Sequence, residues 1–205
     1  MITIVDYGMG NLGSIKNMFK YIGVEAIIES DPHKIQKASK IVLPGVGSFD
    51  TAMQKINKSA LREVLDEKAL KEQVPILGIC LGMQLLTKSS QEGNLEGLGW
   101  IDAKTLQFKG NIPSSYKIPH MGWNSVKKSQ EHPLTKALEE FEECRFYFVH
   151  SYFVEVEDES NSLLKTTYGL EFDSAIVHNN IYGAQFHPEK SHKYGMKFFE
   201  NFARI

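Results

Sequence analysis

Residues 75–86 read PILGICLGMQLL, an apolar run that reaches one cysteine, Cys80, between two glycines and then becomes helical in its pattern. The stretch predicts a strand, a sharp turn and a helix. Gly78 and Gly82 flank Cys80 at the spacing of a nucleophile elbow, in which small residues let the chain reverse tightly and present the nucleophile above a sheet. The sequence therefore predicts that Cys80 stands at the end of a core strand.

Cys80 has two interpretations. As a nucleophile it would share its position with the amide of Leu81, and a helix that begins there supplies free N–H groups and the positive end of a dipole, which favour thiolate over thiol. As a structural residue it would be a small buried hydrophobe. The two glycines favour the nucleophile, although the motif alone names no substrate.

A βαβαβ pattern precedes the elbow. Strands are predicted at residues 2–5, 24–28 and 40–43, and helices at residues 12–22, from residue 32, and over residues 50–71 with a break near Asn57. This order predicts a parallel sheet covered on both faces. The loop 44–50 then lies at the same carboxyl edge as the elbow, where open sheets bind ligands. Two glycines around Val46 would free its amide to face a developing oxyanion together with that of Leu81; the alternative is a loop that merely turns.

The second half of the chain is richer in strands. They are predicted at residues 100–108, 145–149, 153–156, 163–167, 174–177 and 181–186. Their closeness in sequence predicts antiparallel hairpins. Residues 117–124 are predicted to form a compact binding loop, residues 133–141 a short helix, and Ser191 the cap of a final helix. We therefore expect an α/β fold with a mixed, mostly parallel central sheet flanked by helices and an added small antiparallel sheet.

Length and composition exclude several classes of protein. A chain of 205 residues fits one domain, 1–205, with a full hydrophobic core. Lys and Arg number 23 against 25 Asp and Glu, so the net charge of -2 gives no electrostatic case for nucleic acid or an anionic membrane as the main partner. The first residues lack a basic and apolar leader pattern, and no run could span a bilayer, so we expect a soluble cytoplasmic protein. The two cysteines, Cys80 and Cys144, do not resemble a disulfide framework.

A catalytic cysteine needs a proton acceptor, usually a histidine that a third group orients. Four of the seven histidines have simpler explanations as residues at helix starts or in a hairpin turn: His33, His132, His192 and His178. Of the other three, His187 precedes Pro188 and Glu189. Proline favours extended geometry in the residue before it, and residues two apart in an extended chain point the same way, so Glu189 can hold the imidazole. His120 and His150 also remain, and His150 is the alternative base.

Together these residues resemble the class I (triad) glutamine amidotransferases over essentially the whole chain. The general pattern is GICLGMQ at residues 78–84 with QFHPE at residues 185–189. Further motifs resemble one branch of that family, the HisH glutaminase subunits of imidazole glycerol phosphate synthase. They are DYGMGN at 6–11, PGVGSF at 44–49, PHMGWN at 119–124, YFVHSY at 147–152 and HPEKS at 187–191. The resemblance implies the flavodoxin-like fold of the family.

The resemblance also implies a reaction. Cys80 would attack the carboxamide of L-glutamine, His187 would pass the proton to departing ammonia, and Glu189 would orient His187. A γ-glutamyl thioester forms, and water releases glutamate; no cofactor or metal is implied. By the same analogy two further groups of residues serve the site. The glutamine pocket is lined by Gln84, Glu92, Ser151 and Tyr152, and the oxyanion lies near Val46, Gly47 and Leu81.

A partner protein is implied as well. Ammonia in this family passes to a synthase, here a HisF-type (β/α)8-barrel cyclase subunit that makes imidazole glycerol phosphate and aminoimidazole-carboxamide ribonucleotide in histidine synthesis. Asn11, Trp123 and Lys190 would lie at the interface of that heterodimer. Two other functions stay open. A HisH-like paralogue could supply ammonia for sugar amidination in surface-polysaccharide synthesis, or the chain could be a non-catalytic binding subunit, against which the intact Cys-His-Glu set argues.

Overall fold

The computed structural model describes residues 1–58, 60–138 and 140–205. Its first half alternates strands and helices. These elements are β1 Ile2–Val5, α1 Leu12–Tyr21, β2 Ala26–Glu29, α2 Pro32–Ile35, β3 Ile41–Gly45, α3 Phe49–Asn57, α4 Leu61–Asp66 with a π-helical continuation over Glu67–Lys71, β4 Ile76–Cys80 and α5 Leu81–Leu85. The order confirms the βαβαβ pattern that leads into the elbow.

The second half consists mainly of strands and ends in a long helix. Its elements are β5 Ser89–Ser90, β6 Ala103–Gln107, β7 His120–Ser125, β8 Lys127–Lys128, β9 Arg145–His150, β10 Tyr152–Val156, β11 Ser162–Thr167, β12 Glu171–His178, β13 Ile181–Ala184 and α6 His192–Arg204. Within the described ranges, single-turn 3-10 helices lie at Pro133–Thr135, Glu159–Asn161 and Pro188–Lys190.

The large sheet has the order β2-β1-β3-β4-β13-β12-β10-β6-β5, with β11 and β8 attached beside β12. Strands β2, β1, β3, β4 and β13 are parallel, whereas β12, β10 and β6 continue the sheet in antiparallel fashion. A separate two-stranded antiparallel sheet joins β7 to β9. The expected fold class is therefore confirmed: the sheet is mixed, it is parallel where the βα units build it, and a small antiparallel sheet is added.

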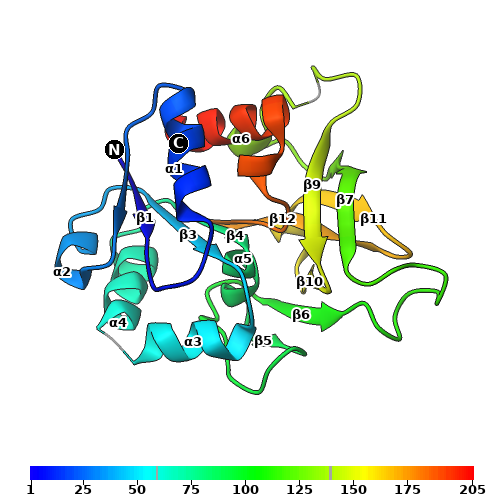
Figure 1. Cartoon of the computed structure of the whole chain (residues 1–205), viewed down its shortest axis with the longest axis horizontal. Coiled ribbons are helices and arrows are strands. Elements are labelled where there is room, and N and C mark those ends of the chain that lie inside the picture. Colours follow the sequence, from blue (N-terminus) through cyan, green and yellow to red (C-terminus); the bar gives the residue numbers. More distant parts are fainter. Residues whose placement is uncertain (59, 139) are drawn as a thin grey trace.

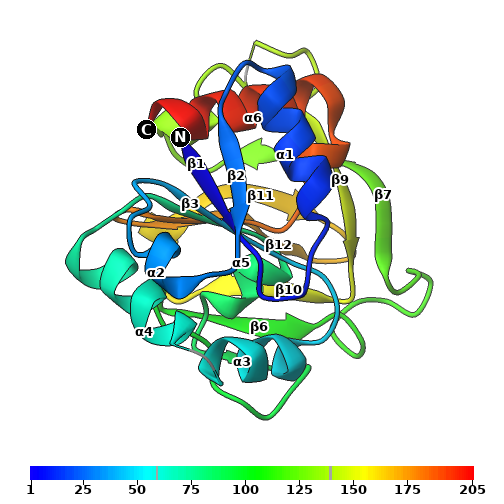
Figure 2. The ribbon, with the colours of Figure 1, turned by 60° about the vertical axis from the view of Figure 1, so that its left-hand side comes forward.

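Helices cover both faces of the large sheet. Figure 2 shows α1 and α6 on one side of it and α3 and α4 on the other. Helix α6 buries a row of aromatic residues, and its Phe199 ring lies 4.4 Å from the ring of Phe19 in α1. On the opposite face, α3 buries Phe49 and Ile56 at the spacing of one helical stripe. These two cores hold the carboxyl ends of the parallel strands at one edge.

The prediction of a loop over residues 117–124 is wrong from residue 120 onward. Residues His120 to Ser125 form β7, which pairs with β9 so that His120 lies opposite His150. The two strands stand upright beside α6 in Figure 1. The local sequence mixes His, Gly and Trp, which hides the alternation, and the strand exists because β9, 30 residues away, supplies its hydrogen bonds.

Two details near the end of the chain also differ from the predictions. The helix expected over residues 133–141 is only a single 3-10 turn, Pro133–Thr135, and Ala137 has a φ of 61°, which is incompatible with a continuing helix. Ser191 stands at the N-cap of α6, but its hydroxyl makes no capping hydrogen bond to the helix. Ser59 and Glu139, which fall inside the predicted helical ranges 50–71 and 133–141, lie outside the described residues. Over the described ranges, every helix is too short or too polar to cross a bilayer.

Candidate active site

Cys80 occupies a strained turn between β4 and α5. Its φ of 55° and ψ of -111° are unusual for a residue with a side chain. Both flanking glycines are required by close backbone contacts: a Cβ on Gly82 would lie 1.9 Å from the Leu43 carbonyl oxygen, and one on Gly78 would lie 2.6 Å from the Gly82 carbonyl oxygen. The strand, sharp turn and helix expected from the sequence are thus present, and the glycines are what allow them to pack so closely.

Besides His187, two polar groups of the described residues lie near the Cys80 sulfur. The sulfur lies 4.0 Å from the carbonyl oxygen of Val149 in β9 and 3.9 Å from Nε2 of Gln185, which follows β13. Gln185 is fully buried and its Oε1 accepts a hydrogen bond of 3.1 Å from Gln84 Nε2. Its amide therefore links the side chain of Gln84 to the sulfur. Sequence reasoning missed Gln185, although a lone amide in the apolar run 181–186 was the signal that could have found it.

His187 and Glu189 form a buried pair at 2.8 Å between Nδ1 and Oε1. The short turn that carries them is held in place by hydrogen bonds to the backbone. The Ser191 hydroxyl donates to the His187 carbonyl at 2.6 Å and accepts from the amide of Tyr147 at 3.0 Å, while the His187 amide donates to the Tyr147 carbonyl. The hydroxyl predicted to cap α6 instead clamps the turn to β9. The imidazole is consequently held in one orientation.

The second imidazole nitrogen of His187 is left for Cys80, because Glu189 occupies Nδ1. Among the described residues, this Nε2 has no hydrogen-bond partner. Burial alone would lower the pKa of His187, but its interactions with the Cys80 sulfur and the Glu189 carboxylate outweigh burial and raise the pKa to about 10. The imidazole therefore carries its proton through neutral pH, and a cationic imidazole beside a sulfur stabilises the thiolate.

A cavity of about 370 Å³ opens directly above the sulfur. It is lined by Val46, Gly47, Cys80, Leu81, Gln84, Glu92, Pro119, Val149, His150, Ser151, Tyr152, His187 and Lys190. The structure thus brings together the elbow, the loop after β3, the junction of β9 and β10, and the His187 turn. Of the residues singled out from the sequence, Glu189 lies behind His187, whereas Asn11 and Trp123 do not line the cavity.

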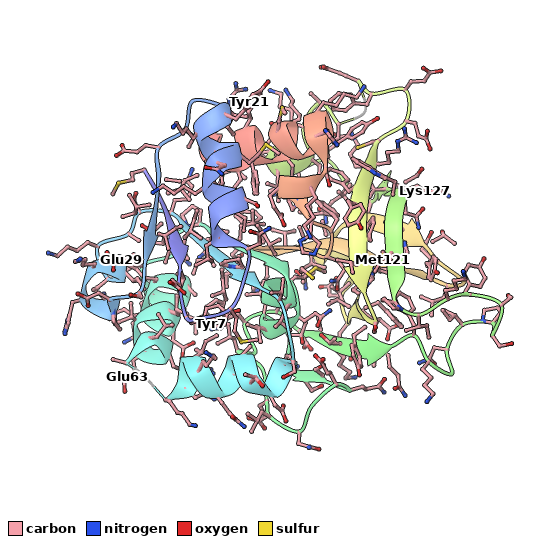
Figure 3. The ribbon with its side chains drawn as sticks, in the orientation of Figure 1. Tyr7, Tyr21, Glu29, Glu63, Met121 and Lys127 are labelled. Atoms are coloured by element: carbon pink, nitrogen blue, oxygen red, sulfur yellow. The ribbon has the colours of Figure 1, made fainter. Side chains whose placement is uncertain are left out.

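The loop after β3 is anchored at one end and free at its tip. Tyr7, which lies in the bend after β1 (Figure 3), donates a 2.6 Å hydrogen bond from its hydroxyl to the Pro44 carbonyl. Burial, assisted by the charge of Cys80, raises the pKa of Tyr7, so this donor stays protonated. At the tip, Val46 is 44% exposed and Gly47 has a φ of 108°. Val46 and Gly47 line the cavity, and neither belongs to a helix or strand.

Two residues expected to bind substrate already have partners in the protein. Gln84 Nε2 donates to the Tyr152 carbonyl at 3.3 Å as well as to Gln185. Glu92 Oε2 accepts from the Phe49 amide at the start of α3, at 3.0 Å. Burial raises the pKa of Glu92 and the nearby Asp50 adds to this, whereas the Phe49 amide opposes it. Both side chains brace the cavity wall.

His150 cannot serve as the base for Cys80, because both of its ring nitrogens have other partners. Nδ1 lies 2.6 Å from the Tyr152 carbonyl oxygen and Nε2 lies 2.9 Å from Nδ1 of His120. This arrangement leaves His187, which has an unoccupied nitrogen, as the histidine able to exchange a proton with the sulfur. Sequence reasoning ranked these histidines in the same order but did not foresee that His120 and His150 contact each other.

The residues expected at a partner interface are spread over three elements. Asn11 precedes α1, Trp123 is 42% exposed on β7 and stacks on the His192 ring at 5.6 Å, and Lys190 lies over the Tyr147 ring at the cavity mouth. Met121, labelled on β7 in Figure 3, is 62% exposed. Exposed apolar side chains on one strand are typical of a surface that contacts another protein.

Comparison with known proteins agrees with this geometry. A family model described as glutamine amidotransferase class-I matches residues 3–205. Imidazole glycerol phosphate synthase subunit HisH 2 of Methanococcus maripaludis is 57% identical over 204 residues, which are 100% of this chain and 99% of that protein. The subunit HisH of Bdellovibrio bacteriovorus is 47% identical over 207 residues and all of both chains.

Solved structures show the same fold at low sequence identity. A crystal structure of a glutamine amidotransferase superposes with a TM-score of 0.76 at 15% identity over 100% of both chains. PurLQS from Thermotoga maritima gives a TM-score of 0.77 at 20% identity over 99% of this chain and 97% of that chain.

Proposed function

Because the chain belongs to the class-I glutamine amidotransferase family, we propose that it is a HisH-type glutaminase subunit of imidazole glycerol phosphate synthase and hydrolyses L-glutamine to glutamate and ammonia in histidine biosynthesis. The observation that carries this function is the buried His187–Glu189 pair, whose free Nε2 belongs to the same cavity as the strained Cys80. We propose the whole chain, 1–205, as one glutamine amidotransferase domain.

The chemistry follows from the protonation of the pair. With His187 protonated and Cys80 as thiolate, the sulfur attacks the side-chain carbonyl carbon of glutamine. The electron pair of the carbon–oxygen π bond moves onto the oxygen. His187 Nε2 donates its proton to the leaving nitrogen, which departs as ammonia when the tetrahedral intermediate collapses to a thioester. The neutral imidazole then takes a proton from water, which attacks the thioester and releases glutamate. Glu189 keeps the proton of Nδ1 in place throughout, so that only Nε2 exchanges.

The negative oxygen of both tetrahedral intermediates needs donors above the elbow. The Leu81 amide, the first of α5, is one, and amides of the loop tip at Val46 and Gly47 are the others. Gly47 already has a positive φ, and Val46 is exposed, so a peptide rotation at the tip costs little packing. This supports a loop whose amides turn toward the oxyanion when substrate and partner are bound.

The rest of the cavity fits the other end of glutamine. Glu92 offers a carboxylate for the α-ammonium group, and the chain at Ser151 and Tyr152 offers further backbone groups in the cavity lining. Gln84 positions this part of the lining through its bond to the Tyr152 carbonyl. A cavity of about 370 Å³ is large enough for one amino acid.

The ammonia is passed to a partner. The relatives are named as subunits of a synthase, which supports a complex with a HisF-type (β/α)8-barrel cyclase subunit. Asn11, Trp123 and Lys190 are the residues of this chain that we assign to the interface. Lys190 is the link to the active site, because it lines the cavity and follows Glu189 directly in the chain.

The test is a glutaminase assay with and without the barrel partner and its nucleotide ligand. Wild-type chain should release glutamate strongly only with both present, and Cys80→Ala should abolish release. Glutamate release by Cys80→Ala at the wild-type rate would refute the assignment. Rescue of a histidine auxotroph lacking its own HisH distinguishes the histidine pathway from supply of ammonia for sugar amidination.

A further inference from the structure

A chain of buried and partly buried hydrogen bonds runs from β7 to the cavity wall. Asn124 Nδ2 lies 3.2 Å from His120 Nε2, and His120 Nδ1 lies 2.9 Å from His150 Nε2. His150 Nδ1 lies 2.6 Å from the Tyr152 carbonyl oxygen. His120 and His150 are 3% and 5% exposed. We refer to Asn124, His120 and His150 as the relay. None of its members takes a step in the glutaminase mechanism described above.

The direction of every bond in the relay is fixed from both ends. At the cavity end the Tyr152 carbonyl can only accept, so His150 Nδ1 carries a proton. At the other end Asn124 Nδ2 also donates to the Thr167 carbonyl at 3.0 Å, and Asn124 Oδ1 accepts from the Ser125 amide at 2.8 Å, which fixes the amide orientation. Asn124 therefore donates to His120 Nε2. A neutral His120 then has its proton on Nδ1 and donates a hydrogen bond to Nε2 of a neutral His150.

The relay has no place for an additional proton. Protonating His150 Nε2 would set two N–H groups against each other at the bond to His120, unless His120 gave up its Nδ1 proton. His120 would then carry its proton on Nε2, opposite the N–H of Asn124. Either change leaves a donor facing a donor, at the buried bond between the rings or at the partly buried bond to Asn124, which is costly. Burial lowers the pKa of both rings, to about 4 for His120 and about 3 for His150.

The rings are enclosed by aromatic side chains. His120 stacks between Phe148 at 4.8 Å and Tyr168 at 4.0 Å, and Phe108 lies 5.2 Å from His150. Among the described residues, the titratable groups that face the pair are Tyr168, which stacks on His120, and His187, whose positive charge further lowers the pKa of His150. Neutral rings beside His187 are thus compatible with a catalytic imidazolium.

We propose that the relay positions the Tyr152 carbonyl in the wall of the glutamine cavity and so couples β7 to substrate binding; this rests on the proposed function, since it takes glutamine as the occupant. The Tyr152 carbonyl oxygen accepts two hydrogen bonds, one from His150 Nδ1 and one from Gln84 Nε2. The outward side chains of β7 include Met121 and Trp123, so a displacement of this strand changes the relay geometry directly. His120 and His150 are positioning residues.

The spectroscopic test is independent of activity. In 15N-resolved histidine spectra of the whole chain between pH 5 and 8, both His120 and His150 should be neutral with the proton on Nδ1, and neither should titrate. A proton on Nε2 of either ring, or a titration of either ring in this range, would overturn the relay. Assignment uses His120→Phe and His150→Phe. Because this readout needs no glutamine, it also separates the relay from the proposed function.

The kinetic test uses two replacements of one side chain. His120→Phe keeps a ring between Phe148 and Tyr168 but removes the donor to His150, and we expect the KM for glutamine to rise about tenfold with kcat changed far less. His120→Asn places an amide N–H near the Nδ1 position and should restore most of the affinity. Alkylation of Cys80 by a small neutral electrophile should be unchanged in both. Tyr168→Phe, which retains the stacking, is the control.

These outcomes test the positioning role of the relay separately from the proposed glutaminase function. A KM within twofold of wild type in His120→Phe, or an equal loss in kcat and affinity that His120→Asn does not rescue, would refute a positioning role. If the wild-type chain released no glutamate even with the partner present, the proposed function would fail. The protonation of His120 and His150 on Nδ1, which is measured without glutamine, would still hold.

Asn124→Asp tests the direction of the relay. A carboxylate at this position can only accept a hydrogen bond, so His120 Nε2 must carry a proton. Because His150 Nδ1 keeps its proton for the Tyr152 carbonyl, two neutral rings with protons on Nδ1 no longer satisfy the chain of bonds, and one ring should become cationic. We expect a histidine of the pair to titrate between pH 5 and 8 in this variant, and the KM for glutamine to rise at the acidic end. Two neutral rings with protons on Nδ1 in Asn124→Asp would contradict the deduced direction.

Discussion

The Nε2 atom of Gln185 lies 3.9 Å from the Sγ atom of Cys80, while Oε1 of the same side chain accepts a hydrogen bond from Gln84. A fully buried amide directed at a sulfur stabilises negative charge there. Gln185→Leu removes this donor at similar volume. We expect alkylation of Cys80 at pH 7 to slow by about tenfold, since a hydrogen bond to a charged group contributes roughly 1.5–3 kcal/mol and sulfur is a weak acceptor.

The control for this replacement is Gln54→Leu, which makes the same change at an exposed position of α3. It should leave alkylation unchanged. Thermal unfolding of both variants establishes that Cys80 is presented by a folded chain. Equal alkylation rates for wild type and folded Gln185→Leu would show that the amide does not act on the sulfur.

The charge of Glu189 should determine the pH range over which Cys80 is reactive. Glu189→Gln keeps a side chain of the same shape beside His187 Nδ1 but loses the charge that helps raise the pKa of His187 to about 10. The imidazolium would then lose its proton at lower pH. We expect the glutaminase kcat/KM to fall by at least about tenfold and its alkaline limb to move toward neutrality. Glu157→Gln, at a surface pair with Lys104, is the control.

The same pair should make the stability of the fold depend on pH. The pKa of His187 is about 10 in the folded chain, against the ordinary value of 6.5 that applies to the unfolded chain, so the folded state binds the proton of this imidazole more tightly. This stabilisation is fully present below about pH 6.5 and is lost as the pH rises toward 10. Urea unfolding at pH 6, 8 and 10 should show a decreasing free energy of unfolding, with a smaller decrease in Glu189→Gln. Parallel pH dependences would contradict this origin.

Gly195 should be required for the position of the His187 turn. A Cβ at Gly195, in the first turn of α6, would lie 1.8 Å from the Pro188 carbonyl oxygen. Gly195→Ala must therefore displace Pro188 and with it Glu189. We expect a loss of about 1–3 kcal/mol in the free energy of unfolding, together with slower alkylation of Cys80.

Gly13 provides the matched control for Gly195. It lies in α1 with no atom within 4 Å of an added Cβ, so Gly13→Ala should stabilise the chain by roughly 0.4–1 kcal/mol through helix propensity and leave alkylation of Cys80 unchanged. If Gly195→Ala were as stable and reactive as wild type, the α6 start would have more freedom than the contact with Pro188 indicates.

The parallel half of the fold could be predicted because its signals are local. Each strand from β1 to β4 is a short apolar run followed by a glycine or proline turn, and the Cys80 elbow carries its two glycines within two residues. The His187–Glu189 pair was also predictable, but for another reason than the expected extended geometry: only His187 is extended, and Glu189 reaches it from the 3-10 turn Pro188–Lys190. Such features depend on sequence neighbours and on backbone geometry, which pattern reasoning captures.

The antiparallel additions depended on contacts that no local pattern contains. Strand β7 forms because His120 pairs with His150, 30 residues away, and the short helix predicted after Pro133 is ended by the backbone of Ala137. Gln185 could be recognised as a buried strand residue, but its place beside Cys80 required the knowledge that β13 pairs with β4. Residues whose role arises from strand order are therefore the ones that the sequence left unassigned.

The backbone strain at Cys80 should lower the free energy of unfolding by a measurable amount. Its φ of 55° and ψ of -111° lie outside the left-handed helical region, and holding a side chain there costs about 1–3 kcal/mol. Cys80→Ala keeps a Cβ and the strain, whereas Cys80→Gly relieves it and loses about 0.5–1 kcal/mol because glycine is more flexible when unfolded. We expect Cys80→Gly to be more stable than Cys80→Ala by up to about 2 kcal/mol in urea unfolding. At exposed Thr51 in α3 the order should be reversed, with alanine more stable than glycine by about 1 kcal/mol. If alanine were the more stable residue at both positions, the turn at Cys80 would not be strained. If glycine is more stable at position 80 and alanine at position 51, the chain retains an unfavourable backbone at Cys80 because that conformation presents the sulfur to the cavity.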